Sequence, residues 1–285
     1  MPYKQNSFIM RTLKLFMLFS IITVGSFFSC QENETPENEI PVDNQPTQKQ
    51  LEKLHDLGIN NKNVTFKSIT DLDGIAKDYF VNDAGISISV KEVNNHQITE
   101  ASARQYHTRN LVSSSNRTIN VLGYTGLGSK GLDTTNQKAL IRAVENYNNL
   151  NSSIHMNLTF GTNQEAADIV VYVRSDLGTG GLAGFPSNGR AYKWARIGPG
   201  VSKKGTTYAT HVITHEMGHC VGLRHTDWFN RVCNGKDEGE GSNGAYHIPG
   251  TPTEIDRGSI MISCGTGNEN GVFNRYDKVA LEYLY

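Results

Sequence analysis

The chain has 285 residues, enough for one or two domains with a full hydrophobic core. Its 27 basic and 28 acidic residues nearly balance, so it lacks the positively charged surface of a nucleic-acid-binding protein, and no nucleic-acid partner is expected. With 19% charged residues and 28 glycines, the composition is typical of an exported, loop-rich globular protein rather than a disordered one.

Residues 1–30 are predicted to be a lipoprotein signal peptide. A positively charged start is followed by an apolar run over residues 13–28, which is shorter than a membrane span. The run ends at Ser29-Cys30 and resembles the signal of bacterial lipoproteins, in which the cysteine is lipidated and becomes the new N-terminus. Phe27 stands where leucine is more usual, and a plain secretory signal is the alternative.

The residues after Cys30 are predicted to be a flexible tether over 31–47, because they are rich in Pro, Asn and Glu. Their acidic start resembles the surface-export signal of Bacteroidetes lipoproteins. We therefore expect an outer-membrane or cell-surface lipoprotein, anchored to the membrane through Cys30 or released to the medium.

Residues 48–116 are predicted to form a small pro-segment or an accessory domain. Leucines at every third position in 48–57 indicate a short helix, and alternating apolar residues in 64–69 and 79–90 indicate strands. Residues 105–116 are polar and contain three consecutive serines. An exposed join of this kind favours cleavage and hence a removable pro-segment, and the alternative is an accessory domain that is never removed.

From Arg117 to the end, the pattern is that of an α+β catalytic domain, residues 117–285. Strands are predicted at 118–124, 157–160, 169–173 and 192–197. A helix is predicted from Asp133 to about residue 150. The strand at 169–173 is nearly all apolar, which indicates a central place in the sheet.

Residues 178–186 contain several glycines and a proline, which suits the edge of a sheet rather than its centre. Main-chain hydrogen bonds along such an edge bind an extended peptide with little regard to its side chains. The candidate substrate-binding residues are Gly181, Leu182, Ala183 and Gly184. A plain flexible loop is the alternative interpretation.

The most informative stretch is residues 215–227, which read HEMGHCVGLRHTD. On a helix predicted to begin at residue 206 or 207, His215 and His219 leave the same face. Gly222 permits the left-handed residue that ends a helix, and the resulting turn can bring His225 back as a third nitrogen ligand. Three neutral imidazoles leave one position of a tetrahedral zinc ion open, as a catalytic zinc site requires.

Three polar residues near these histidines are given separate roles. Glu216 can reach a water bound to the metal and is the candidate catalytic base. Asp227 is expected to hydrogen-bond near the helix end or to the third histidine. His211 lies one turn before His215 on the same helical line, and it is expected to support or pack rather than to bind the metal.

The number of cysteines limits the number of disulfides that the chain can form. If Cys30 carries lipid, three of the four cysteines remain, and at most one pair can form within the chain. Cys233 and Cys264 bracket the segment after the third histidine and are predicted to pair in an oxidising compartment. Cys220 is then a small buried thiol.

The glycine-rich loop over 234–244 carries Asp237, Glu238 and Glu240. Calcium would require oxygen ligands at a regular spacing, and the spacing here fits no standard site. A solvated loop is therefore favoured over a calcium site.

The spacing HExxHxxGxxH is the metzincin signature, and Met261 resembles the Met-turn methionine that forms an apolar floor beneath the metal. The chain from about Arg117 resembles the dual-action HEIGH metallopeptidases, on stretches 215–227, 245–252, 259–264 and 276–285. The resemblance implies a metzincin-like zincin fold, with a twisted mixed sheet, an active-site helix, a backing helix and an irregular C-terminal subdomain that ends in a helix.

Two departures from the pattern qualify the resemblance. The motif reads HEMGH, and the tyrosine that astacin-type enzymes place two residues after the methionine is absent, since Ser263 stands there. An astacin-like fifth ligand is therefore not expected. Tyr246 or His247 is a candidate donor to the transition state.

The sequence thus predicts a monomeric zinc endopeptidase that binds one catalytic ion and hydrolyses internal peptide bonds of extracellular proteins. Two alternatives are a zinc-binding surface lipoprotein without proteolytic activity and a zinc hydrolase of a non-peptide amide. The presence of Glu216 argues against the first, because metal binding alone does not need it. The extended glycine-rich edge favours peptides over other amides.

Overall fold

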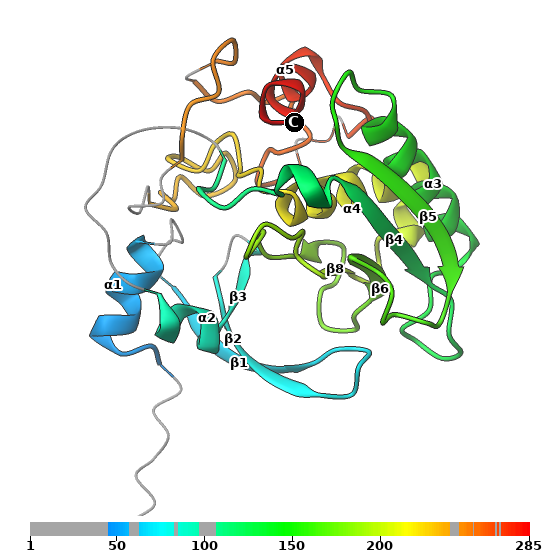
Figure 1. The fold of residues 1–285 in the computed structure, drawn as a ribbon, viewed down its shortest axis with the longest axis horizontal. Helices are drawn as coiled ribbons and strands as arrows, with labels where there is room; N and C mark the ends of the chain where they lie inside the picture. The colour runs from blue at the N-terminus through cyan, green and yellow to red at the C-terminus, as the bar shows by residue number, and fades with distance from the viewer. Residues whose placement is uncertain are drawn as a thin grey trace, which may run out of the picture. The chain divides into compact units, whose positions relative to one another are not determined.

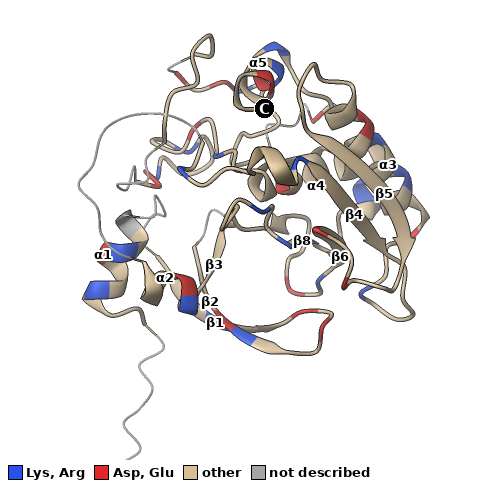
Figure 2. Cartoon of the chain, in the orientation of Figure 1, with Lys and Arg blue, Asp and Glu red and all other residues tan. Residues whose placement is uncertain are grey.

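The computed structural model describes residues 45–56, 63–82, 85–96, 107–239, 245–252, 254–265, 267 and 269–285. The predicted signal peptide with Cys30, and nearly all of the predicted tether, lie outside these ranges. No helix within them is long and apolar enough to span a membrane. Basic and acidic residues are interspersed over the described elements in Figure 2, in line with a formal net charge of −1.

A five-stranded mixed sheet forms the centre of the fold (Figure 1). Its strands are β4 (Thr118–Tyr124), β5 (His155–Gly161), β6 (Ile169–Val173), β7 (Gly181–Leu182) and β8 (Trp194–Ile197), in the order β5-β4-β6-β8-β7. The first four in this order are parallel, and β7 is antiparallel to β8 at the edge. The predicted central position of β6 and the predicted edge at Gly181–Leu182 are confirmed.

Two helices, α3 (Thr134–Asn148) and α4 (Thr206–Cys220), pack on one face of this sheet and on each other. The side chain of Asp133 caps α3 by accepting the N–H of Asn136 at 2.8 Å. Alternate residues of β4, β6 and β8 meet the buried faces of both helices, and this layer holds the largest hydrophobic core. The expected active-site helix with a backing helix is thereby confirmed.

The N-terminal elements form a second, three-stranded antiparallel sheet of β1 (Thr65–Thr70), β2 (Ala76–Val81) and β3 (Ser87–Ser89). Two short helices, α1 (Gln48–Asp56) and α2 (Val90–Asn95), pack beside it around a small core of their own.

The single strand predicted over residues 79–90 is wrong, because β2 and β3 are separate strands that pair antiparallel. Asn82 accepts the N–H of Ile86 through its side-chain oxygen at 3.1 Å, and Gly85 has a φ of 79°, which favours glycine. The apolar alternation continues on both sides of this reversal, so periodicity alone did not reveal it.

Between α4 and the C-terminal helix α5 (Arg275–Leu284), the described residues form neither helix nor strand. Short 3₁₀ turns, η1 (Ser114–Asn116) and η2 (Ser202–Lys204), precede β4 and α4. The start of α5 is fixed by a capping box between Asn274 and Asp277. The irregular C-terminal part ending in a helix is therefore as predicted.

Candidate metal centre

The three predicted histidine ligands come from α4 and from the turn that follows it. His215 and His219 lie one turn apart on α4 and are both at least nine-tenths buried. Gly222 has a φ of 103°, and the N–H of Leu223 returns to the carbonyl of Gly218 at 2.9 Å. This left-handed turn reverses the chain and brings His225 back against the helix.

The Nε2 atoms of the three histidines converge. His215 and His219 are 3.0 Å apart at Nε2, and each lies 3.1 Å from Nε2 of His225. Two nitrogens bound to one zinc at about 2.0–2.1 Å with tetrahedral angles lie about 3.3 Å apart. The spacing of the three Nε2 atoms therefore fits a single zinc ion. Among the described residues, these three histidines are the group whose ligand atoms lie close enough together to hold a metal ion.

Each of these histidines has an acceptor at its other ring nitrogen. Nδ1 of His215 lies 2.8 Å from the carbonyl of Ile260, and Nδ1 of His219 lies 2.8 Å from the carbonyl of Leu223. Nδ1 of His225 lies 2.7 Å from Oε1 of Glu238. A proton on each Nδ1 leaves the lone pair of each Nε2 free to bind a cation. Burial lowers the pKa of His215 to about 4 and also lowers those of the other two, so the neutral ligand forms are favoured.

Glu216 lies beside this triad and lines a pocket of about 100 Å³. The side chain is 4% exposed, and burial raises the pKa of its carboxyl group well above the usual value. The Oε2 atom is buried without a hydrogen-bond partner. A buried carboxylate oxygen of this kind is available to a proton on a bound molecule. The pocket is also lined by Gly180, Gly181, Tyr208, His211, Val212, His215, Ile262, Ser263, Gly265 and Glu269.

Met261 lies beneath the active-site helix, as expected for a Met-turn. It is 2% exposed, and its carbonyl accepts the N–H of Thr226 at 2.9 Å. A Cβ atom added to Gly218 would lie 2.5 Å from the sulfur of Met261, so the glycine within HEMGH lets the methionine approach the helix. The preceding residue, Ile260, supplies the carbonyl that holds His215.

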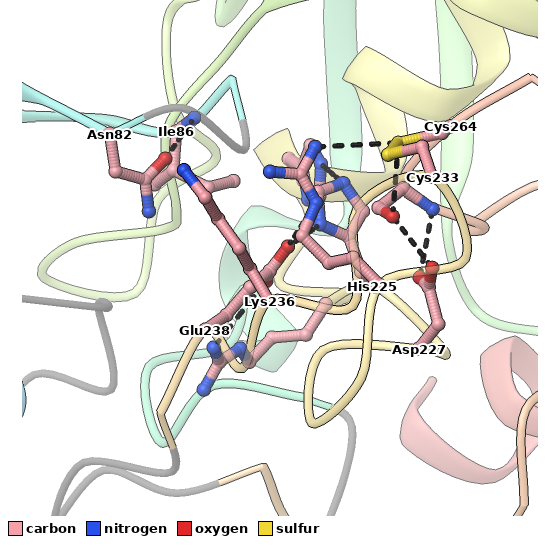
Figure 3. A network of polar contacts seen from close by, with 12 residues as sticks. Asn82, Ile86, His225, Asp227, Cys233, Lys236, Glu238 and Cys264 are labelled. Carbon is pink, nitrogen blue, oxygen red and sulfur yellow. Dashed lines mark hydrogen bonds and ion pairs between the residues drawn. A yellow bond between two sulfur atoms is a disulfide. The ribbon is translucent and has the colours of Figure 1, made fainter. Parts of the chain in front are cut away.

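Glu238 is the site residue that the sequence did not reveal, because its loop was interpreted as solvated. The side chain is 2% exposed and points to His225, as Figure 3 shows. Asp227, which was expected to hydrogen-bond near the helix end or to the third histidine, accepts the N–H of Ser263 at 2.9 Å and the N–H of Val232 at 2.8 Å. It thus joins the turn after the third histidine to the segment after Met261.

The predicted substrate edge is partly occupied by the chain itself. The N–H of Ser87 donates to the carbonyl of Ala183 at 2.8 Å, and the N–H of Ala183 donates to the carbonyl of Gly85 at 3.3 Å. A Cβ atom on Gly184 would lie 2.5 Å from the carbonyl oxygen of Ser87. Gly181 is different, because its Cα faces the Glu216 side chain. A Cβ atom there would lie 2.5 Å from Cγ of Glu216 and closer still to the carboxylate.

Tyr246 and His247 do not line the pocket beside Glu216. The hydroxyl of Tyr246 accepts a hydrogen bond from Arg109 at 3.2 Å, and its ring stacks on His107. Nε2 of His247 lies 2.5 Å from the carbonyl of Thr251. Both side chains are therefore engaged outside the pocket beside Glu216.

His211 is not one of the three converging imidazoles, although it lines the same pocket. The structure joins Cys233 and Cys264 in a disulfide (Figure 3), and Cys220 is a buried free thiol. Glu240 lies outside the described residues.

Residues 79–285 match the family described as dual-action HEIGH metallo-peptidases. Two structures of myroilysin are similar at 17% and 16% sequence identity, each over 57% of this chain and over 77% and 81% of their own, with a TM-score of 0.35 in both cases. No curated protein matches the chain. Because the family match spans most of the sequence, the chain belongs to the dual-action HEIGH metallopeptidase family.

Proposed function

We propose that this metallopeptidase is a zinc-dependent endopeptidase that cleaves internal peptide bonds of extracellular proteins. The observation that carries the proposal is the convergence of three imidazole Nε2 atoms within 3.1 Å of one another, with the buried carboxyl group of Glu216 beside them. A zinc ion held by His215, His219 and His225 supplies Lewis-acid activation of a water molecule and of the substrate carbonyl.

Glu216 performs the proton transfers. Its unpartnered Oε2 accepts a proton from the attacking water. The same carboxyl group then delivers that proton to the amine of the leaving peptide. Glu216 thereby serves as base and acid in one cycle.

The test is the variant Glu216→Gln, which keeps the side-chain volume and removes the base. We expect it to bind zinc as the wild type does and to lose nearly all hydrolysis of casein, as measured by release of soluble peptides. Glu145→Gln, on the exposed face of α3, is the matched control and should retain full activity. Undiminished casein hydrolysis by the Glu216 variant would refute the proposal.

The same proposal assigns the mature protein to the outside of the cell. Support comes from the predicted signal peptide and from the Cys233–Cys264 disulfide, which requires an oxidising compartment. The protein is anchored by lipid on Cys30 and acts as a monomer. Mass spectrometry of the native N-terminal peptide should show a diacyl or triacyl modification on this cysteine, and an unmodified N-terminus elsewhere would contradict the anchor.

A further inference from the structure

Glu238 lies in the irregular segment after the third histidine, yet it is held in place. Its N–H donates to the carbonyl of Trp228 at 2.6 Å, and the N–H of Arg231 donates to the carbonyl of Lys236 at 2.9 Å. The disulfide begins at Cys233 in the same loop and ends beyond the Met-turn. Glu238 is therefore held in place by its neighbours, although residues 233–237 just before it are exposed.

The carboxylate of Glu238 faces one histidine and two arginines. Oε1 lies 2.7 Å from Nδ1 of His225 and 3.4 Å from Nε of Arg231, and Oε2 lies 3.9 Å from a guanidinium nitrogen of Arg224. Both arginine side chains are buried, at 6% and 3% exposure. Without the carboxylate, the buried positive charges of Arg224 and Arg231 would lie unbalanced beside a site that binds a zinc ion, which is itself positively charged.

Among the three acceptors that hold the histidine Nδ1 atoms, only this one is a side chain. Those of His215 and His219 are main-chain carbonyls, which no substitution removes. Glu238 is therefore the acceptor whose contribution can be measured by mutation.

We infer that Glu238 is a positioning residue for the metal centre. It fixes the ring orientation of His225, keeps the proton on Nδ1, and offsets the charge of Arg224 and Arg231. Such carboxylate partners of metal-bound histidines typically change metal affinity about 10- to 100-fold when they are removed. The inference deepens the proposed function, because it rests on the metal-binding half of that proposal.

The experiment compares zinc affinity in the purified full-length protein by competition with a chromogenic chelator. Glu238→Ala removes both the acceptor and the charge, and we expect its zinc affinity to fall about 10- to 100-fold. Glu238→Gln keeps an oxygen that can accept from Nδ1 and removes only the charge, so its loss should be smaller. The matched control is Asp237→Asn, on an exposed neighbour in the same loop, which should bind zinc as the wild type does.

The outcomes separate this inference from the proposed function. A wild type that fails to bind zinc would sink the proposed function itself. Folded Glu238 variants with unchanged zinc affinity would overturn the positioning role while leaving the proposed function intact. Lowered thermal stability with unchanged zinc affinity would show a merely structural role. If Glu238→Ala does not fold, the isosteric glutamine variant still gives the answer.

A second, independent observation concerns the interface between the N-terminal layer, defined as β1 to α2, and the central sheet. Asp71 and Arg196 are both fully buried and form two parallel hydrogen bonds of 3.0 Å. The hydroxyl of Tyr172 donates to the same carboxylate at 2.5 Å. Ser87 also accepts from Arg196 at 3.1 Å, so the layer supplies most of the acceptors for this buried cation.

Apolar contacts also join the N-terminal layer to the central sheet. On the sheet face opposite to α3 and α4, Leu122, Val170, Tyr172 and Trp194 are all less than 5% exposed, and Leu72 of the N-terminal layer packs against them. The chain after the layer is also bonded to the catalytic part, because the N–H of Thr108 donates to the carbonyl of Gly222 at 2.9 Å.

We infer that the N-terminal layer is a permanent part of the catalytic unit and not a removable pro-segment. Its departure would break the ion pair between Arg196 and Asp71 and would expose an apolar sheet face to water. A peptide substrate then reaches the pocket along Gly180 and Gly181, because the main-chain groups of Ala183 stay paired with Gly85 and Ser87.

Two experiments test this second inference. Asp71→Asn should lower both thermal stability and peptidase activity, whereas release of an inhibitory segment would raise activity. Asp73→Asn, in the same turn but partly exposed, should change either property far less. Cleavage at a specific protease site inserted between residues 97 and 106 should leave the two fragments co-eluting on size exclusion with unchanged activity. Dissociation of the N-terminal fragment together with a gain in activity would overturn the inference, and co-elution does not depend on the proposed function.

Discussion

Replacing Gly181 by alanine should displace the carboxyl group of Glu216 without strain in the backbone. The added Cβ atom would lie 2.5 Å from Cγ of Glu216, whereas two carbon atoms pack at about 3.5 Å. The side chain of Glu216 or the edge strand must therefore move by about 1 Å. A misplacement of this size near the reacting atoms costs about 100-fold in rate, or about 2.7 kcal/mol of transition-state stabilisation.

The assay is kcat/KM on a quenched fluorescent peptide, with zinc affinity measured on the same samples. Gly181→Ala should lose about 100-fold in kcat/KM and keep its zinc affinity, because the three atoms nearest to the new methyl group all belong to Glu216. Gly161→Ala is the matched control, because its Cβ atom would meet nothing within 4 Å and Gly161 does not line the pocket. Wild-type kcat/KM for Gly181→Ala, or an equal loss in both variants, would refute this reasoning.

Three further predictions concern stability. Asp277 accepts the N–H groups of Ile260 at 3.0 Å and Asn274 at 2.9 Å, so Asp277→Asn should lower the free energy of unfolding by about 1–3 kcal/mol. Burial raises the pKa of Asp277 from 3.8 to about 6, so the folded state binds this proton more tightly than the unfolded state. The wild-type free energy of unfolding should therefore contain a contribution that is fully present below about pH 4 and is lost as the pH rises through about 6. Urea titrations across this pH range should show the contribution in the wild type and not in Asp277→Asn. Identical pH profiles of the two proteins would contradict the prediction. Replacing Cys233 and Cys264 by serine opens a loop with a sequence separation of 31 and should cost about 3–4 kcal/mol in the same assay, where an unchanged denaturation midpoint would be the contrary result.

The parts of the site that the sequence predicted are those set by local spacing. His215 and His219 share a helix face because they are four residues apart, and the left-handed turn at Gly222 follows from the freedom of glycine. The start of α4 was likewise predicted to within one residue.

The parts that the sequence did not predict depend on contacts between distant segments. Glu238 lies in a glycine-rich loop whose composition suggests exposure, and only the folded chain brings it against His225. The pairing of Ser87 with Ala183 joins segments 96 residues apart, and neither carries a signal for the other. The pairing of Arg196 also depends on Asp71, which lies in the turn between β1 and β2.

The central claim is that one metal ion on three imidazoles, with Glu216 beside it, performs the hydrolysis. It is tested most directly by adding zinc stepwise to the metal-free protein while bound zinc and peptide cleavage are measured together. We predict that cleavage is absent at the start and rises in proportion to bound zinc up to one equivalent, and that Glu216→Gln binds the same equivalent without cleaving. Cleavage by the metal-free protein, or by the zinc-loaded Glu216 variant at the wild-type rate, would contradict the claim.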